Sequence, residues 1–371
     1  MTSSAVVSVF VVGTRAQLIK VAPVIVACEE AGQPVLLLLT GQHKETMQDL
    51  VVEFGIRCRQ QDVVTVSERS TVWSLLGWAP RAYLALSRQL KQLRNQARTI
   101  NVVVHGDTLS TVIGALAAKR RGVPLFHLES GLTSGRLFDP FPEELSRRIV
   151  FRLASVAICP SADSAQYMAA NHSCQAVNSK ENTIVDAVMI ATTQSRRKEP
   201  AAASSQPYLV VSLHRFQNLF DGKRLRYLMT LLAELAARYP IHFVLHPATR
   251  RRLQSEGLLE SLSRVPGLLL SPRLGYSDFL NLAAHAACVL TDGGSNQEEL
   301  AVLGVPTIVM RQYTERPDGL GQNAVMEADV GPDFLAYCMA GRFESLRRTS
   351  RVRADMGPSR LVARLLSGAE G

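Results

Sequence analysis

The sequence predicts an α/β protein built from two doubly wound, Rossmann-like domains, each with a parallel β-sheet between two layers of helices. Two observations indicate this fold class. Apolar strand-like runs alternate with helix-like segments along nearly the whole chain of 371 residues, as in consecutive βαβ units. Between residues 195 and 207 the alternation gives way to small, polar and proline residues, a composition typical of a linker between domains.

The first domain is expected at residues 1–194. Its strands are unbroken aliphatic runs, as expected where helices cover both faces of a parallel sheet, and amphipathic segments follow them as helices. We expect strands at 6–12, 35–39, 101–104, 124–128 and 156–159, and helices at 20–31, 43–54, 73–98, 110–121 and 143–153.

The second domain is expected at residues 208–371 and repeats this alternation. We expect strands at 208–213, 242–245, 268–270, 288–291 and 307–310, and helices at 223–238, 276–287 and 295–303. The tail from Arg342 to Gly371 ends in a helical segment, and we expect this last helix to return to the first domain. Ligands of doubly wound sheets bind beyond the carboxyl ends of the strands, so the site is expected in a cleft between two facing domains.

The composition is that of a globular protein, and it excludes several other classes. Apolar residues make up 47% of the chain, no apolar stretch approaches the length of a membrane span, and no secretory signal precedes the first strand. The six cysteines are dispersed without a C-x-x-C pair, which indicates reduced thiols in a cytoplasmic protein. The net charge of +9 comes from scattered arginines without a nucleic-acid-binding motif, so we expect no nucleic-acid partner.

The segment from Cys288 to Leu300 has the strongest local signal in the chain. An apolar strand is followed by the tight turn Asp292-Gly293-Gly294, and a helix begins with Ser295 as the expected N-cap and Glu298 as its capping-box partner. Backbone N–H groups at such a helix start bind phosphate or diphosphate. Glu298 and Glu299, one turn into the helix, are placed to accept hydrogen bonds from ribose hydroxyls.

Polar residues also end the other expected strands. Each has a structural explanation, since a strand-end Asp commonly caps a helix and a strand-end His is commonly a hydrogen-bonded structural residue. Together, however, three carboxylates of the first domain, Asp107, Glu129 and Glu143, accompany cationic and histidine side chains of the second. Such a set fits acid–base chemistry on a phosphorylated substrate. The polar segments are 13–15, 40–43, 105–108, 129–131, 142–144, 214–215, 246–247, 311 and 314–316.

These segments resemble the bacterial UDP-N-acetylglucosamine 2-epimerase family, whose members have the two-domain GT-B fold. The similarity runs from about Val11 to about Asn323, and its short motifs follow one another at family-like spacing. The motifs are Gly13-Thr-Arg-Ala-Gln-Leu-Ile-Lys20, Thr40-Gly-Gln-His43, His105-Gly-Asp-Thr108, Glu129-Ser-Gly-Leu132, Pro142-Glu-Glu144, His214-Arg215, Thr291-Asp-Gly-Gly-Ser-Asn-Gln-Glu-Glu299 and Thr314-Glu-Arg-Pro317.

The resemblance implies interconversion of UDP-GlcNAc and UDP-ManNAc for cell-surface polysaccharide precursors, by anti elimination of UDP and its re-addition to a 2-acetamidoglucal. This route requires a base for the C2 proton, an acid–base group on the other face of the sugar, and cations that hold the departing UDP. No cofactor and no metal is implied, and the first turn lacks the spacing G-x-G-x-x-G of a nicotinamide site. The resemblance also implies a homodimer.

By residue matching, the resemblance implies catalytic roles for Asp107, Glu129, Glu143, His214 and Lys20. The three carboxylates would transfer the protons, and the sequence leaves open which of them acts on which face of the sugar. A second set would bind the UDP-sugar: Arg15, His246, Gly293, Gly294, Ser295, Glu299 and Arg316.

The chain also departs from the family pattern. Ala16-Gln17 stand where the family usually has Pro-Glu, Thr133-Ser134 where it has Arg-Thr, Ser146 where it has Asn, and Gln217 where it has Glu. Gln42-His43 match only part of the family's regulatory UDP-GlcNAc site, which leaves allosteric activation open.

Three other functions stay open. A hydrolysing 2-epimerase would release ManNAc and UDP, a retaining GT-B glycosyltransferase would pass the sugar to an acceptor, and a non-catalytic protein would only bind UDP-sugars. The motif Thr40-Gly-Gln-His43 favours the non-hydrolysing reaction, and retention of all three carboxylates argues against the last two functions. The sugar is open as well, because another 2-acetamido nucleotide sugar would suit the same chemistry.

Overall fold

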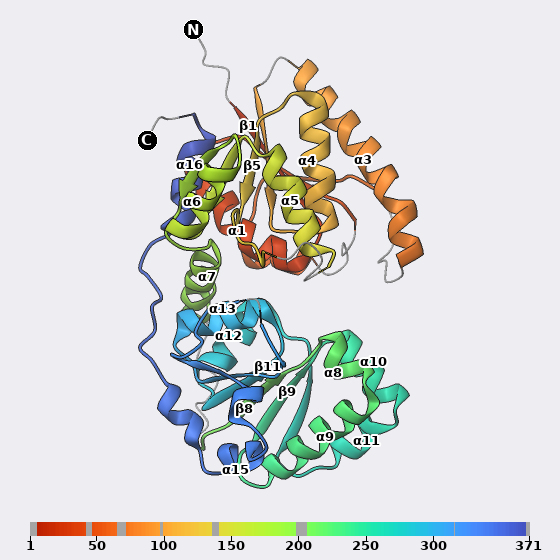
Figure 1. Ribbon diagram of the computed structural model, residues 1–371, viewed down its shortest axis with the longest axis vertical. Helices are drawn as coiled ribbons and strands as arrows, with labels where there is room; N and C mark the ends of the chain where they lie inside the picture. Colours follow the sequence, from red (N-terminus) through yellow and green to blue (C-terminus); the bar gives the residue numbers. More distant parts are fainter. Residues whose placement is uncertain are drawn as a thin grey trace. The chain divides into compact units, whose positions relative to one another are not determined.

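The computed structural model describes residues 6–41, 47–64, 72–96, 99–135, 141–197, 206–314 and 316–368. The chain divides into two compact units (Figure 1). Unit 1 comprises Met1–Ala187 and Ala354–Gly371, and unit 2 comprises Val188–Arg353. The division falls within helix α7 (Ile184–Arg197), upstream of the expected boundary at residue 194, and most of the expected linker lies outside the described residues.

Unit 1 is built on a seven-stranded parallel sheet in the order β3-β2-β1-β4-β5-β6-β7. Its strands are β1 (Val7–Val12), β2 (Val35–Leu39), β3 (Arg59–Asp62), β4 (Ile100–His105), β5 (Leu125–Leu128), β6 (Val156–Cys159) and β7 (Gln175–Asn178). Its helices are α1 (Arg15–Glu30), α2 (Gln48–Glu53), α3 (Val72–Asn95), α4 (Leu109–Arg121), α5 (Glu143–Leu153), α6 (Ala162–Asn171), the start of α7, and α16 (Pro358–Leu366).

Helices cover both faces of this sheet. Helices α3, α4 and α5 pack side by side on one face, and α1 packs with α16 on the other (Figure 1). Alternate residues of β1, among them Val9 and Val11, lie in one core cluster with Trp78 of α3. The buried indole N–H of Trp78 donates to the carbonyl of Thr40 at 3.0 Å, so this core contains a satisfied polar group.

A helix from the end of the chain completes unit 1. The carboxylate of Asp186 in α7 accepts hydrogen bonds from the backbone N–H groups of Gly357 at 3.0 Å and Ser359 at 2.8 Å. These groups belong to the start of α16, where a carboxylate satisfies free donors and complements the helix dipole. At the other end of α16, Asn101 donates to the carbonyl of Leu366 at 3.2 Å.

Unit 2 is built on a six-stranded parallel sheet in the order β10-β9-β8-β11-β12-β13. Its strands are β8 (Leu209–Ser212), β9 (Ile241–Leu245), β10 (Leu268–Pro272), β11 (Cys288–Thr291), β12 (Thr307–Val309) and β13 (Ala324–Met326). Its helices are α8 (Phe216–Phe220), α9 (Gly222–Ala236), α10 (Pro247–Ser255), α11 (Leu258–Ser263), α12 (Tyr276–Ala284), α13 (Gly294–Leu303), α14 (Glu327–Val330), α15 (Phe334–Met339) and the 3₁₀ helix η2 (Arg342–Leu346).

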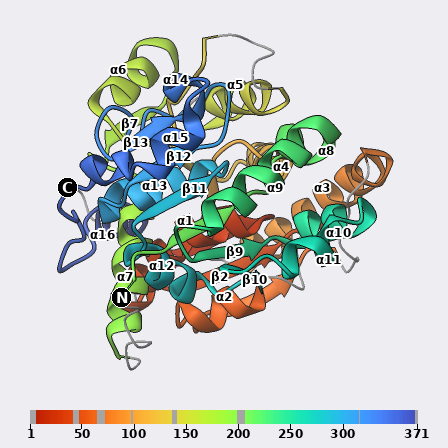
Figure 2. The same cartoon turned by 90° about the horizontal axis from the view of Figure 1, so that it is seen from below.

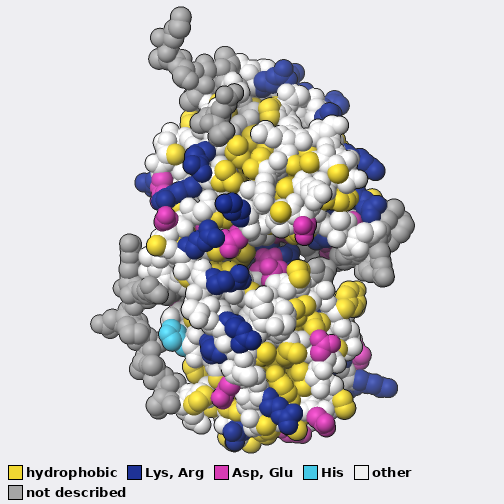
Figure 3. Space-filling model, turned by 60° about the vertical axis from the view of Figure 1, so that its left-hand side comes forward, with side chains coloured by type: hydrophobic (Ala, Val, Ile, Leu, Met, Phe, Trp, Pro, Cys, Tyr) yellow, Lys and Arg dark blue, Asp and Glu magenta, His cyan; other side chains and the backbone are white. Residues whose placement is uncertain are grey.

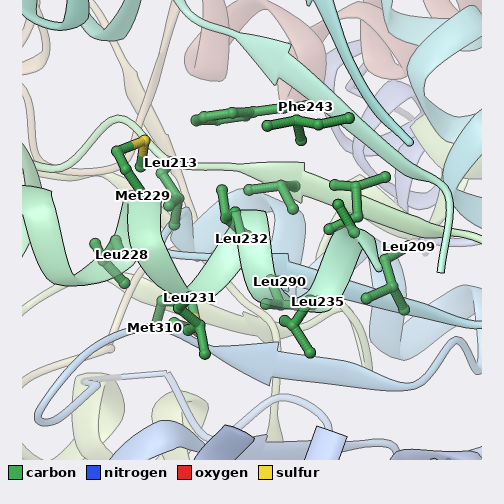
Figure 4. Close-up of a cluster of buried hydrophobic side chains, with 14 of the residues drawn as sticks. Leu209, Leu213, Leu228, Met229, Leu231, Leu232, Leu235, Phe243, Leu290 and Met310 are labelled. Atoms are coloured by element: carbon green, nitrogen blue, oxygen red, sulfur yellow. The ribbon is translucent and has the colours of Figure 1, made fainter. Parts of the chain in front are cut away.

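The core of unit 2 lies between α9 and the sheet. Leu228, Leu231, Leu232 and Leu235 recur at helical spacing and form one apolar face of α9. Figure 4 shows this face against side chains of the central strands, including Phe243 of β9. Helices α10 and α11 pack beside each other in the same unit (Figure 2).

Two strands of unit 1 that the sequence analysis missed lie at the two edges of its sheet. Residues Arg59–Asp62 of β3 and Gln175–Asn178 of β7 are polar and partly exposed, so they lack the aliphatic run by which the central strands are recognised. The expected helix at 20–31 begins earlier, at Arg15, because Thr14 caps it and Gln17 completes a capping box.

The basic residues are dispersed on the face of the molecule that Figure 3 shows. Lysine and arginine side chains lie there singly or in small groups among other side chains. None of the helices within the described ranges combines the length and apolar character that crossing a membrane requires.

Candidate active site

The candidate residues follow strands on either side of the point where the strand order reverses in each sheet. In unit 1 this point lies between β1 and β4, and in unit 2 between β8 and β11. Loops diverge there beyond the carboxyl ends of the strands, which leaves room for a ligand. Lys20 and Asp107 follow β1 and β4, and His214 and Gly293 follow β8 and β11.

Glu129 follows β5 and lies at the centre of the unit 1 site. One carboxylate oxygen, Oε2, accepts hydrogen bonds from Lys20 Nζ and Asn182 Nδ2, and His105 Nε2 lies 3.6 Å from it. The side chains of Lys20 and Glu129 are almost entirely buried, so each compensates the charge of the other. Glu129 has a φ of 62°, a left-handed conformation that costs a non-glycine residue energy and that persists at functional positions.

His127 holds the strand ends that carry Asp107 and Glu129. Its Nε2 donates to the carbonyl of Gly106 at 2.9 Å, so Nδ1 accepts from the hydroxyl of Ser130 at 3.0 Å. Complete burial lowers the pKa of His127 from 6.5 to about 4. The ring is therefore neutral at physiological pH and acts as a fixed bridge between β4 and β5.

Asp107 pairs with an arginine that the sequence analysis did not single out. Arg147 Nη2 lies 2.5 Å from Asp107 Oδ2, and Arg147 Nη1 lies 3.6 Å from Glu144. Burial alone would lower the pKa of Arg147, but the carboxylates of Asp107, Glu129 and Glu144 raise it. The guanidinium thus stays charged between these acidic side chains.

Glu143 and Glu144 begin α5 and differ in their surroundings. Glu144 is fully buried and accepts from Thr133 Oγ1 at 2.5 Å, from the backbone N–H of Ser134 at 3.2 Å and from Arg148 Nε at 3.1 Å. The residues at the departure Thr133-Ser134 therefore hold a structural carboxylate. Glu143 Oε2 is buried and has no hydrogen-bond partner within the described part of the chain, so it can accept or donate a hydrogen bond to a ligand.

Gln17, at another departure from the family pattern, joins the first turn to β4. Its Oε1 accepts from the backbone N–H of Gly13 at 2.9 Å, and its Nε2 donates to the carbonyl of His105 at 2.7 Å and to Thr111 Oγ1 at 2.8 Å. Arg15, expected to bind substrate, forms an ion pair with Asp49 at 2.5 Å.

In unit 2 the site is the start of α13. The expected capping box of Ser295 and Glu298 is wrong: Gly293 is the N-cap, the helix begins at Gly294, and no side chain caps it. Glu298 instead forms an ion pair with Arg316. A residue without a Cβ occupies the cap, which leaves the first N–H groups of α13 without a side-chain cap and places them for an anion.

The two glycines let positive and aromatic side chains approach this helix start. A Cβ at Gly293 would lie 2.9 Å from His214 Cε1, and a Cβ at Gly294 would lie 2.9 Å from Arg316 Nε and 3.5 Å from Arg215 Nη2. One histidine and two arginines therefore lie against the start of α13. This arrangement suits a diphosphate, because guanidinium groups and helix N–H groups both bind phosphate oxygens.

His214 is held by a buried carboxylate. Asp292 is fully buried, and its oxygens accept from the backbone N–H groups of His214 at 2.9 Å and Arg215 at 3.0 Å and from Asn218 Nδ2 at 2.9 Å. The ring of His246 lies 5.5 Å from that of His214. Partial burial lowers the pKa of His214, Asp292 opposes this effect, and Arg215 reinforces it.

The structure thus brings together subsets of the expected residues within each unit. Lys20 contacts Glu129 in unit 1, and His214, Gly293, Gly294, Arg316 and His246 gather in unit 2. Ser295 and Glu299 lie in the first turns of α13, where Glu299 is buried. Gln42, His43 and Glu315 lie outside the described residues, and no group of three or more potential metal ligands occurs within the described ranges.

Several functional candidates were not singled out from the sequence: Asn182, His127, Arg147, Asp292 and Asn218. His127 lies inside a buried strand, Asn182 precedes α7, and Arg147 faces inward from α5, so their partners are distant in sequence. Only Asp292 had a local signal, since it directly precedes the glycine turn.

Comparison with known proteins agrees with this geometry. A family model described as UDP-N-acetylglucosamine 2-epimerase matches residues 27–340. The UDP-N-acetylglucosamine 2-epimerase of Methanococcus maripaludis is 26% identical, covering 96% of this chain and 97% of its own. That of Salmonella typhimurium is 28% identical, covering 85% of this chain and 84% of its own.

Solved structures establish the fold. The UDP-GlcNAc 2-epimerase of Neisseria meningitidis bound to UDP-GlcNAc has a TM-score of 0.77 at 24% identity, covering 98% of this chain and 99% of that one. The Methanocaldococcus jannaschii UDP-GlcNAc 2-epimerase in complex with UDP-GlcNAc and UDP has a TM-score of 0.76 at 23% identity, covering 98% and 99%. The predicted fold class, two Rossmann-like units of the GT-B type, is confirmed.

Proposed function

The chain belongs to the UDP-N-acetylglucosamine 2-epimerase family, and we propose that it interconverts UDP-GlcNAc and UDP-ManNAc without hydrolysing them. The observation that supports this proposal most directly is the pair of complementary sites. Unit 2 has a glycine-rich helix start with cations beside it, and unit 1 has three carboxylates, one of which keeps a buried oxygen that no described residue bonds. An elimination that expels UDP requires both kinds of site.

In this proposal unit 2 holds the leaving group. The N–H groups at the start of α13, with Gly293, Gly294 and Ser295, would bind the diphosphate together with Arg215 and Arg316. His214 and His246 complete the positive surroundings, and Glu299 would bind the ribose. Negative charge develops on the departing UDP as the bond to C1 breaks, and these groups stabilise it.

Unit 1 would transfer the protons. A base removes the C2 proton, the C2–H electrons form the C1=C2 double bond, and UDP leaves with the electrons of the C1–O bond. In the return step a UDP oxygen adds to C1 of the 2-acetamidoglucal, and an acid delivers a proton to the opposite face of C2. One carboxyl group must therefore act as a base and another must hold a proton.

The three carboxylates differ in their contacts. Asp107 is paired with Arg147, and Glu129 is paired with Lys20, so a cation fixes the position of each. Glu143 Oε2 is buried and has no hydrogen-bond partner within the described residues, so this oxygen can contact the sugar directly. Lys20 would then keep Glu129 ionised while the sugar reacts.

Incubation with UDP-GlcNAc in D2O, followed by NMR of the sugar, tests the proposal. We expect UDP-ManNAc with deuterium at C2. Free ManNAc with UDP would show the hydrolysing reaction instead, and transfer of sugar to an added acceptor without deuterium at C2 would indicate a glycosyltransferase. Absence of C2 exchange, also after addition of further UDP-GlcNAc as an activator, would contradict epimerisation by this protein.

We also propose that the protein acts as a homodimer in the cytoplasm. The resemblance implies the dimer, and the six cysteines, all present as free thiols, suit a reducing compartment. Sedimentation velocity at micromolar concentration tests the first point: a single species with the mass of one 40.6 kDa chain would contradict the dimer.

A further inference from the structure

The carboxylate of Asp292 directly precedes the candidate phosphate-binding turn and accepts several hydrogen bonds. It is fully buried, and it accepts hydrogen bonds from the backbone N–H groups of His214 and Arg215 and from Asn218 Nδ2, at 2.9–3.0 Å. Its Oδ1 also lies 3.4 Å from Nδ1 of the His214 ring. Asp292 therefore holds the backbone at His214 by hydrogen bonds and lies beside Nδ1 of its ring.

These contacts set the orientation of the imidazole. Nδ1 faces Asp292, whereas Cε1 lies 2.9 Å from the position of a Cβ on Gly293. The ring is thus held between the buried carboxylate and the start of α13. Nε2, on the side of the ring remote from Asp292, is the nitrogen left to meet a ligand at that helix start.

A network behind Asp292 holds it in place. Asn218 also donates to the carbonyl of Met310 at 2.8 Å and accepts from Arg224 Nε at 3.2 Å. Arg224 Nη1 in turn donates to Glu327 at 2.8 Å. Because each member has a defined partner, the carboxylate of Asp292 cannot turn away from His214 without breaking several hydrogen bonds.

Without a ligand, more positive than negative groups surround the ring of His214. Arg215 and Arg316 lie at the adjacent glycine, Arg316 is itself paired with Glu298, and the His246 ring lies 5.5 Å away. Against these positive groups and partial burial stands the carboxylate of Asp292. A bound diphosphate would add two negative charges on the Nε2 side and reverse the balance.

We propose that Asp292 is a positioning residue that makes His214 a proton-linked phosphate sensor, so that His214 Nε2 takes up a proton from solvent when the diphosphate binds and releases it when the diphosphate leaves. The inference rests on the proposed function, since it assumes a nucleoside diphosphate sugar at the start of α13. With the proton, the imidazolium lies between two anions, the Asp292 carboxylate and the diphosphate, and stabilises both.

The proposal fixes the direction of a pH effect. The pKa of His214 is lowered in the free protein by partial burial, so the ring is neutral near pH 7, and the ligand raises this pKa again. If the bound state holds more protons than the free state, affinity must rise as pH falls. The effect ends where His214 is already protonated in the free protein.

Isothermal titration calorimetry with UDP-GlcNAc tests this. The sugar-linked diphosphate does not titrate near neutral pH, so any proton taken up belongs to the protein. The wild type is titrated between about pH 6 and 8 in two buffers of different ionisation enthalpy. We expect uptake of up to about one proton per bound ligand in the wild type and none from this site in His214→Asn.

Asp292→Asn is the decisive variant, since it removes the negative charge and keeps the shape. We expect roughly tenfold weaker binding near pH 7 and proton uptake displaced to lower pH, because the imidazolium has lost its anion. Asp186→Asn is the matched control: Asp186 is equally buried and also accepts two backbone N–H groups, but it lies in unit 1. It should leave the proton uptake unchanged.

The outcomes separate the inference from the proposed function. If the wild type neither binds UDP-GlcNAc nor exchanges C2, the function is contradicted. If it epimerises but takes up no proton, or if Asp292→Asn retains the wild-type uptake and affinity, only the role of Asp292 and His214 is wrong. Should Asp292→Asn fail to fold, His214→Asn still tests the proposal, because the His214 side chain is 36% exposed and its replacement is expected to leave the fold intact. Proton uptake that persists in His214→Asn would overturn the proposal.

Discussion

The strand-end sites of the two units share a topology and differ in their use of charge. In unit 1 two of the three carboxylates are paired with a buried cation, Glu129 with Lys20 and Asp107 with Arg147. In unit 2 Arg215 and Arg316 lie against an uncapped helix start. Ion pairs fix the positions of the groups proposed to transfer protons, whereas a surplus of positive charge and N–H groups is suited to binding an anion.

The two histidines at these sites make the same contrast. His127 in unit 1 is fully buried, and its neutral ring joins the ends of β4 and β5 through hydrogen bonds of both nitrogens. His214 in unit 2 is partly exposed beside Asp292 and can respond to a ligand. The same side chain is structural in one unit and titratable in the other, because His127 is fully buried with both ring nitrogens engaged, whereas the side chain of His214 is partly exposed.

Substitution of the unit 1 carboxylates should have the largest effect. We expect Asp107→Asn and Glu143→Gln each to lower kcat about 10²–10⁴-fold while the affinity for UDP changes little, because proton transfer is lost and the diphosphate site is intact. Steady-state kinetics and UDP titration measure the two quantities. Glu260→Gln, at an exposed ion pair, is the matched control and should retain the wild-type rate. A large loss of UDP affinity in the unit 1 variants would contradict the assignment of proton transfer to unit 1 and diphosphate binding to unit 2.

The pH dependence of the free energy of unfolding should reveal the contribution of His127 in unit 1. The pKa of His127 is lowered to about 4 by burial, so between pH 6.5 and 4 the unfolded chain binds a proton that the folded chain does not. Stability therefore falls as pH falls through this window, by roughly 3 kcal/mol from this residue. Urea unfolding of the wild type and His127→Gln at several pH values measures it. If the free energy of unfolding varied with pH in the same way in both proteins, burial would not lower the pKa of His127.

A smaller effect is expected at the glycines of unit 2. In Gly294→Ala the new Cβ would lie 2.9 Å from Arg316 Nε, so the arginine must move and UDP binding should weaken about tenfold with kcat less affected. Gly77→Ala, in α3, meets no atom within 4 Å and is the control. It should leave binding unchanged and raise stability by about 0.5–1 kcal/mol, since alanine favours helix. Equal effects of the two substitutions on UDP binding would argue against a site at the α13 start.

The smallest effects distinguish the helix starts of the two sites. Thr14 caps α1 and Gln17 completes its capping box, so Thr14→Ala should cost about 1 kcal/mol in the free energy of unfolding. Ser295 caps nothing in α13, so Ser295→Ala should change this free energy by less than about 0.5 kcal/mol. Thermal or urea unfolding measures both. A loss at Ser295 as large as that at Thr14 would mean that the serine caps the helix after all.

Sequence reasoning placed the central strands well and the edges poorly. The limits expected for β2, β6 and β11 agree with the structure, because aliphatic runs mark strands that are covered on both faces. β3 and β7 were missed because edge strands carry polar residues. β13 was missed because it is an edge strand in which three apolar residues lie between Asn323 and Glu327. The predicted N-cap at Ser295 is wrong, because the capping-box pattern ignores tertiary contacts. Gly293 is the N-cap, and Glu298 forms an ion pair with Arg316.

The order of motifs along the chain determined the family, the fold class and the strand ends at which the candidate residues lie. Those properties follow from local composition and from the rule that ligands bind beyond parallel strands. Tertiary structure alone decided the partners: Lys20 and Asn182 on Glu129, Arg147 on Asp107, and Asp292 on His214. These contacts join residues tens of positions apart, and the charge state and aim of a side chain depend on what surrounds it in space, which no local pattern in the sequence records.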